Sequence, residues 1–134
     1  MQRHVIAVIT IFAATVGLAS ERAVSSAEAD RLARAAIRAQ ETGICNVHHI
    51  RMQKKSVSIH WGLVTFEEPY YSAELRGFPN AREYVNGGCE FDEREDKKPH
   101  WRYVCPECQR VEVAWARAHR SEPEAQSILK PQKT

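Results

Sequence analysis

Two short pairs of cysteine and histidine are the residues best suited to chemistry. Cys45 and His48 form a C-x-x-H pair, and Cys105 and Cys108 form a C-x-x-C pair in the run CPEC. A two-residue spacer lets both side chains of a tight turn point at one centre, and two such turns complete a tetrahedral zinc site. The spacing therefore predicts a metal centre of the Cys₃His type, with zinc as the expected ion.

The spacing does not decide whether His48 or Cys89 is the fourth metal ligand. Residues 49–104 separate the two pairs, which is longer than the usual gap of a zinc ribbon. Cys89, after two glycines, is either a spare thiol or a ligand in place of His48. The candidate metal ligands are Cys45, His48, Cys89, Cys105 and Cys108.

Disulfide bonding is a second interpretation of the same cysteines. Four cysteines allow three pairings: Cys45–Cys89 with Cys105–Cys108, or either arrangement that ties the C-terminal pair to Cys45 and Cys89 individually. A long pairing would stabilise the fold by roughly 2–4 kcal/mol, because it constrains the unfolded chain. The protein would then be a disulfide-stapled binding module.

A third interpretation is catalytic. A strand that leads into CPEC at the start of a helix is typical of thiol–disulfide oxidoreductases, in which the helix end lowers the pKa of the first thiol, here Cys105. However, a thioredoxin fold needs further strands and a helix after this motif, and the segment after Cys108 is short.

The first twenty residues indicate export. Met1–His4 is a short basic start, Val5–Ala19 is uncharged and apolar, and small residues precede a cleavage point near Ala19 or Ser20. This pattern is typical of a secretory signal peptide, whereas a membrane span needs about 20 apolar residues. We expect a periplasmic or secreted protein with no membrane association after cleavage. Such a compartment favours disulfides, while the spacing favours a metal.

Composition narrows the function classes. The chain has 134 residues with 19 Lys+Arg and 17 Asp+Glu, a formal net charge of +2, and it contains no basic block. Nucleic-acid binding is therefore not expected. Motifs of serine hydrolases, P-loop nucleotide-binding proteins and zinc proteases are absent. A protein without catalysis of its own is the favoured interpretation, and any partner would be an unidentified protein.

Three helices must position the site. A helix over 26–42 is predicted by the capping box S-x-x-E at Ser25 and by the stop at Gly43. Proline followed by glycine predicts a short helix over Pro69–Gly77, and apolar periodicity predicts another over Pro106–His119.

Alternation of apolar and polar residues with a period of two predicts the strands. Val57–Trp61 and Trp101–Cys105 alternate in this way, and Val47–Met52 is a candidate strand before a turn at Gln53–Lys55. The charged run Glu90–Pro99 is expected to be a solvated hairpin connection. The fold class is α+β: a small antiparallel sheet with flanking helices and a zinc-ribbon-like or disulfide-stapled core.

The chain divides into four parts. These are a signal peptide (1–20), an N-terminal helical segment (21–43), a Cys/His-stabilised α+β domain (44–119) and a disordered tail (120–134). A domain of this size has a marginal core and usually needs a metal or disulfide staple.

The central motifs resemble a group of small, functionally uncharacterised bacterial proteins with a CxxH…GGC…CPxC pattern. The resemblance covers Cys45 to Trp115 and also includes the run Phe78-Pro79-Asn80. It implies that Cys45, His48, Gly87, Gly88, Cys89, Cys105 and Cys108 belong to one spatial site. It implies no activity.

Overall fold

The structure is an α+β arrangement, as predicted. The computed structural model describes residues 22–63 and 65–130, so the predicted signal segment lies outside the described residues. In chain order the elements are α1 (Ser26–Thr42), β1 (Gln53–Trp61), α2 (Tyr70–Gly77), β2 (Tyr84–Gly88), α3 (Glu93–Asp96), β3 (His100–Val104), α4 (Pro106–Ala118) and α5 (Pro123–Leu129).

The sheet is mixed rather than antiparallel. Its order is β2–β1–β3, with β1 antiparallel to β3 and parallel to β2. The expectation of an antiparallel sheet is therefore wrong for the β1–β2 pair. The reason is the connection: residues 62–83 include α2, and parallel strands need a crossover of a dozen or more residues, usually helical.

The region before β1 also differs from the prediction. Gln53–Lys55 is the first part of β1 and pairs with β3, so it is not a turn. Val47–Met52 is not a strand: Val47 and His48 lie within a tight turn, which an isolated bridge between Ile44 and Arg51 closes. Period-2 alternation missed the start of β1 because its first two side chains are both exposed.

The predicted helices are confirmed. The Ser25 side chain accepts a hydrogen bond from the backbone N–H of Glu28 (3.3 Å) and so caps α1. Gly43 ends this helix at φ 70°, and a Cβ at this position would lie 3.1 Å from the Tyr103 ring. Helices α2 and α4 begin and end within one residue of the predicted bounds.

The tail is not wholly disordered. Pro123–Leu129 forms α5, which packs on α4 and buries Ala125 completely. The expectation for 120–134 is thus wrong over these residues. Pro123 suits the first turn of a helix, and Ala125 and Ile128 supply the apolar contacts, which are too few to stand out by periodicity.

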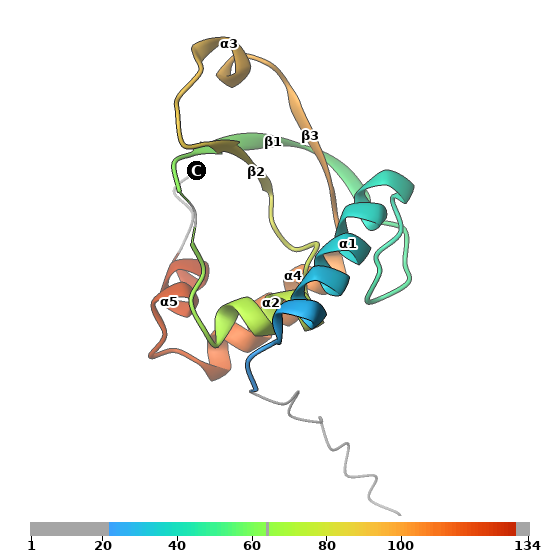
Figure 1. Cartoon of the computed structure of the whole chain (residues 1–134), viewed down its shortest axis with the longest axis vertical. Helices are drawn as coiled ribbons and strands as arrows, with labels where there is room; N and C mark the ends of the chain where they lie inside the picture. The colour runs from blue at the N-terminus through green and yellow to red at the C-terminus, as the bar shows by residue number, and fades with distance from the viewer. Residues whose placement is uncertain (1–21, 64, 131–134) are drawn as a thin grey trace, which may run out of the picture.

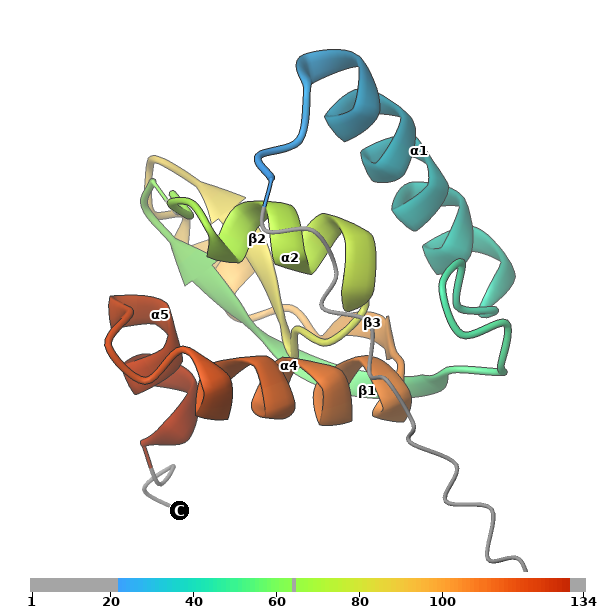
Figure 2. The same cartoon turned by 90° about the horizontal axis from the view of Figure 1, so that it is seen from below.

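Helices α2, α4 and α5 lie on one side of the sheet, and α1 runs along the edge of this layer beside α2 (Figures 1 and 2). The core contains an aromatic group in which Tyr70 contacts Phe78 and Trp115, with ring centroids 5.7 Å and 5.2 Å away. It continues into three fully buried cysteines. The core therefore joins the helical layer directly to the predicted metal ligands.

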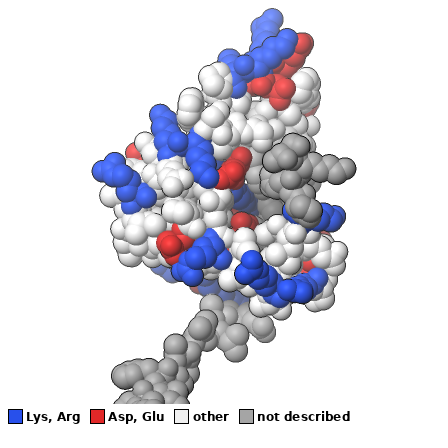
Figure 3. All heavy atoms as spheres, turned by 180° about the vertical axis from the view of Figure 1, so that it is seen from behind, with Lys and Arg blue, Asp and Glu red and all other residues white. Residues whose placement is uncertain are grey.

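Charges on the surface are mixed. On the face seen in Figure 3, Lys and Arg side chains are scattered among acidic ones. Helix α3 and the two residues after it carry charges of both signs, with Lys97 paired to Glu93 and Lys98 paired to Glu95. Among the described residues, no helix is long and apolar enough to cross a membrane.

Candidate metal centre

The first ligand pair sits in a compact turn after α1. The backbone N–H of Cys45 donates to the Ile50 carbonyl (2.9 Å), and the N–H of His49 donates back to the Cys45 carbonyl (2.9 Å). His49 adopts the left-handed conformation, with φ 55°, which closes the turn. The backbone N–H of His48 points at the Cys45 sulfur, 3.4 Å away. This backbone path directs both ligand side chains to the same side.

The second pair lies where β3 passes into α4. Cys105 is the N-cap of α4, and its sulfur accepts from the backbone N–H of Cys108 (3.5 Å). Pro106 occupies the first turn of the helix, where no backbone N–H is needed. The second pair therefore comes from a helix start, not from a second β-turn as in a zinc ribbon.

The four ligand atoms converge. Cys45, His48, Cys105 and Cys108 each present one ligand atom, and these atoms all lie within 4.8 Å of one another. The Sγ atoms of Cys45 and Cys108 are 3.6 Å apart, and His48 Nδ1 lies 3.4–3.7 Å from the three sulfurs. Tetrahedral bonds of zinc place two sulfurs about 3.8 Å apart, and a sulfur and an imidazole nitrogen about 3.6 Å apart. The cluster could hold a metal ion.

Electrostatics distinguish the three thiols. Burial opposes ionisation of Cys45, but the backbone N–H groups of His48 and Val47 outweigh it and lower the pKa of this thiol to about 6. Burial raises the pKa values of Cys105 and Cys108, and the neighbouring Cys45 adds to both shifts. Three thiolates are therefore unfavourable together without a cation among them, and a divalent metal supplies that charge.

A buried amide supports the ligands from outside. Asn80 is fully buried, and its Nδ2 group donates to Asn46 Oδ1 (2.8 Å) and lies 3.5 Å from the Cys45 sulfur. The backbone carbonyl of Asn80 accepts a hydrogen bond from the backbone N–H of Cys105 (2.9 Å). Asn80 thus links both ligand pairs, the role that outer partners play in protein metal sites.

The Gln40 side chain joins helix α1 to Asn80. Gln40 Nε2 donates to Asn80 Oδ1 (3.0 Å) and to the Tyr103 carbonyl (2.8 Å), and Gln40 Oε1 accepts from the Tyr103 N–H (3.0 Å). The amide therefore pairs with the open edge of β3 as a strand would. In the sequence, Asn80 appears only within the run Phe78-Pro79-Asn80 of the resemblance, and Gln40 carries no signal because its partners are distant along the chain.

Cys89 is not part of the cluster. It is exposed and follows Gly88 at the end of β2, beside the Trp61 end of β1. The ligand cluster lies near the opposite end of β1, where Gln53 pairs with Val104. A nine-residue strand separates the two places by roughly 25 Å. His48, rather than Cys89, completes the set, and the implied membership of Cys89 and its two glycines in one site is not found.

The cysteines are all free. All four lie among the described residues, and none forms a disulfide. The 3.6 Å between the Cys45 and Cys108 sulfurs exceeds the S–S bond length of about 2 Å. The catalytic interpretation also meets an obstacle, because Cys105 and Cys108 are fully buried and their pKa values are raised rather than lowered.

Comparison of the chain with protein-family models, with curated proteins and with solved structures gave no match. The resemblance to small bacterial proteins of the CxxH…GGC…CPxC pattern therefore stays a prediction.

Proposed function

We propose that the protein is a small exported protein whose Cys45, His48, Cys105 and Cys108 hold one structural zinc ion and which has no catalysis of its own. The observation that carries the proposal is the tetrahedral spacing of four ligand atoms from two separate segments. Zinc suits this donor set because thiolate sulfur and imidazole nitrogen are its usual structural ligands.

The position of the cluster supports a structural role. The three cysteines are fully buried within the core, and His48 is partly buried, so the set offers no open ligand position of the kind that catalytic zinc keeps for water. The metal would join the turn after α1 to the start of α4, two segments that are 57 positions apart at their nearest ligands. Export is proposed from the basic start and apolar run of the first twenty residues.

The test is zinc stoichiometry with reversible unfolding. The chain from Glu21 onward should contain one zinc per molecule by elemental analysis. Removal of zinc by a strong chelator should abolish cooperative thermal unfolding in circular dichroism, and added zinc should restore it. A metal-free protein with the same cooperative transition would overturn the proposal.

Protein from its native compartment tests the two alternatives, a disulfide-stapled module and a thiol–disulfide oxidoreductase. Protein purified from its own compartment is alkylated before and after denaturation and weighed intact. The zinc protein should show three protected thiols that become reactive on denaturation, with Cys89 reactive throughout. Two intact disulfides would instead identify a stapled module, and disulfide reductase activity lost in Cys105→Ser would identify an oxidoreductase.

A further inference from the structure

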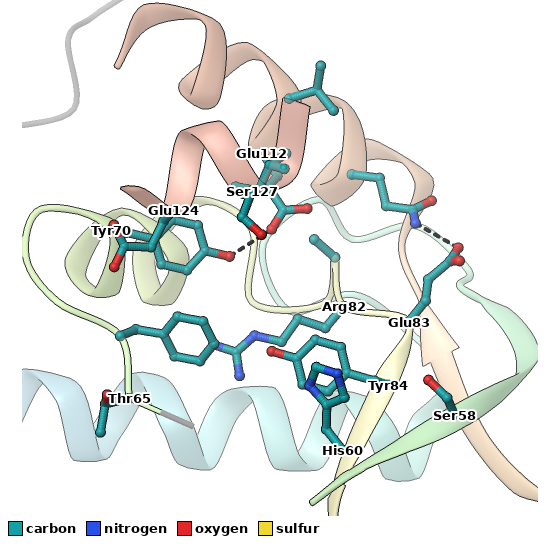
Figure 4. A pocket seen from close by; sticks show the side chains of 15 residues that line it. Ser58, His60, Thr65, Tyr70, Arg82, Glu83, Tyr84, Glu112, Glu124 and Ser127 are labelled. Atoms are coloured by element: carbon teal, nitrogen blue, oxygen red, sulfur yellow. Dashed lines mark hydrogen bonds between the residues drawn. The ribbon is translucent and has the colours of Figure 1, made fainter. Parts of the chain in front are cut away.

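A second polar region lies on the other side of the aromatic core. It is a cavity of about 720 Å³ between the sheet, α2, α4, α5 and the segment before α2. Small-molecule sites commonly have volumes of about 300–1,000 Å³ and combine apolar walls with a few convergent polar groups. This cavity has that character, because aromatic rings and charged side chains line it together (Figure 4).

One wall carries a cationic group among aromatic rings. The Arg82 guanidinium lies 3.9 Å from the centroid of the Phe66 ring and 5.8 Å from that of Tyr84, whose ring in turn contacts His60. Among the described residues, the Tyr84 hydroxyl and the His60 ring nitrogens have no hydrogen-bond partner. Two groups that can donate hydrogen bonds therefore stand beside a guanidinium.

Arg82 is not fully compensated by its own partner. It forms a close ion pair with Glu74, which is almost completely buried. Burial raises the pKa of the Glu74 carboxyl to about 7 despite Arg82. Burial thus disfavours the charged form of Glu74 and weakens its compensation of Arg82.

The opposite wall is acidic. Glu112 of α4 accepts a hydrogen bond from the Tyr70 hydroxyl (2.7 Å) through Oε1, and its second oxygen has no partner among the described residues. Burial raises the pKa of this carboxyl, whereas the Tyr70 hydroxyl and Arg82 lower it. Ser127 lies beside Glu112 on this wall, and Glu124 also lines the cavity (Figure 4). Neither of these α5 side chains has a hydrogen-bond partner in the described part of the chain.

We propose that this cavity binds a small zwitterion of the amino-acid or dipeptide class, with its carboxylate at Arg82 and its ammonium at Glu112. A simple anion would pair with Arg82 alone, and a simple cation would pair with Glu112 alone. A ligand with both charges pairs with both walls, and its side chain meets Phe66 and Tyr84. This binding does not depend on the proposed zinc role.

The probes are glycyl-phenylalanine, its N-acetyl form, its C-terminal amide and free phenylalanine, measured by titration calorimetry on the zinc-loaded chain. Glycyl-phenylalanine or phenylalanine should bind saturably, and the better of the two identifies a dipeptide or an amino-acid site. Blocking either charge should weaken binding at least about tenfold. No binding up to about 10 mM, or equal binding of a blocked form, would overturn the proposal.

Variants test which cavity residue binds the ammonium of the ligand and which binds its carboxylate. Glu112→Gln keeps an acceptor for Tyr70, so it should weaken glycyl-phenylalanine about tenfold and leave the N-acetyl form unchanged. Arg82→Lys keeps a charge beside Glu74 but loses the planar fork, so it should weaken binding of all three probes that carry a carboxylate. Glu83→Gln is the matched control, since Glu83 also lines the cavity but is already bonded to Lys55 and Gln109. Unchanged zinc content verifies that each variant folds; equal effects of Glu112→Gln and Glu83→Gln would refute the assignment.

Discussion

The metal centre and the cavity are both polar regions within one small domain, but their polar groups are satisfied in opposite ways. At the metal centre, ligand sulfurs and the Asn80 and Gln40 amides bond to one another, and their partners are protein groups. In the cavity, Tyr84 and one oxygen of Glu112 face open space. The first region is built to be closed around one ion, and the second leaves bonding capacity for a ligand.

The difference also has an energetic side. Buried polar groups that bond one another rigidify a core, whereas buried ions with incomplete pairing reduce stability. Glu74 and Arg82 form such an ion pair beneath the cavity, and the buried Arg82 Nε atom has no hydrogen-bond partner in the described part of the chain. We infer that the metal centre stabilises the domain and that the cavity is a cost to stability.

The largest effect is expected from Cys108→Ser. This cysteine is fully buried, and serine keeps its size while losing the thiolate ligand. Structural zinc contributes an apparent binding free energy of about 10–16 kcal/mol at neutral pH, which is comparable to the whole stability of a domain. The variant should lose both its zinc and its cooperative melting, measured by elemental analysis and circular dichroism. Cys89→Ser, the exposed control, should change stability by less than about 0.5 kcal/mol.

A smaller effect is expected where the two regions meet. Phe78 is 1% exposed and packs against both Tyr70 and Trp115. Phe78→Ala should lower the free energy of unfolding by about 3–5 kcal/mol, because it leaves a cavity in the core. Urea unfolding at saturating zinc measures the change, and Phe78→Leu is the milder companion. One bound zinc should remain in the folded variant; parallel loss of zinc would show that the two regions are not separable.

The metal centre was largely predictable from the sequence, for a physical reason. Both ligand pairs are local: residues three apart in a turn or a first helical turn must lie close together, whatever the rest of the chain does. Distance along the chain did not reveal whether His48 or Cys89 completes the set. That choice depends on the length and direction of β1, which places Cys89 beyond the far end of the strand.

The cavity could not be predicted in the same way. Its walls come from β1, β2, α2, α4, α5 and the segments before α2 and β2. These parts meet because β1 pairs with β2 in parallel, which the sequence does not predict. Alternation identifies which residues share a face of a strand but not which strand lies beside it. Arg82 and Glu112 therefore appeared in the sequence as ordinary charged residues. Helices α1, α2 and α4 were predictable because their cap, proline and periodicity signals are local too, whereas Pro123 alone did not reveal α5.

Asn80→Asp tests whether the buried amide of Asn80 supports the metal ligands and leaves the cavity unaffected. Aspartate keeps an oxygen for Gln40 but cannot donate to Asn46 or toward the Cys45 sulfur, and it adds negative charge near the thiolates. Zinc affinity should fall about 10–100-fold, measured by competition with a chromophoric chelator. The glycyl-phenylalanine affinity of the zinc-saturated variant should stay unchanged. Reduced stability with unaltered zinc affinity would mean that Asn80 is a packing residue and not a support of the ligands.

The smallest effect is expected at the start of α1, which lies outside both regions. All of α1 is described, and Ala39 is its one fully buried residue, so the helix is held mainly through polar contacts at its two ends. Ser25→Ala removes the cap and should cost about 1 kcal/mol, which corresponds to about fivefold faster amide exchange in the first turn. Zinc affinity should not change, because α1 reaches the metal centre through Gln40 at its other end. A fall in zinc affinity would show that the whole helix, and not this one amide, is coupled to the metal site.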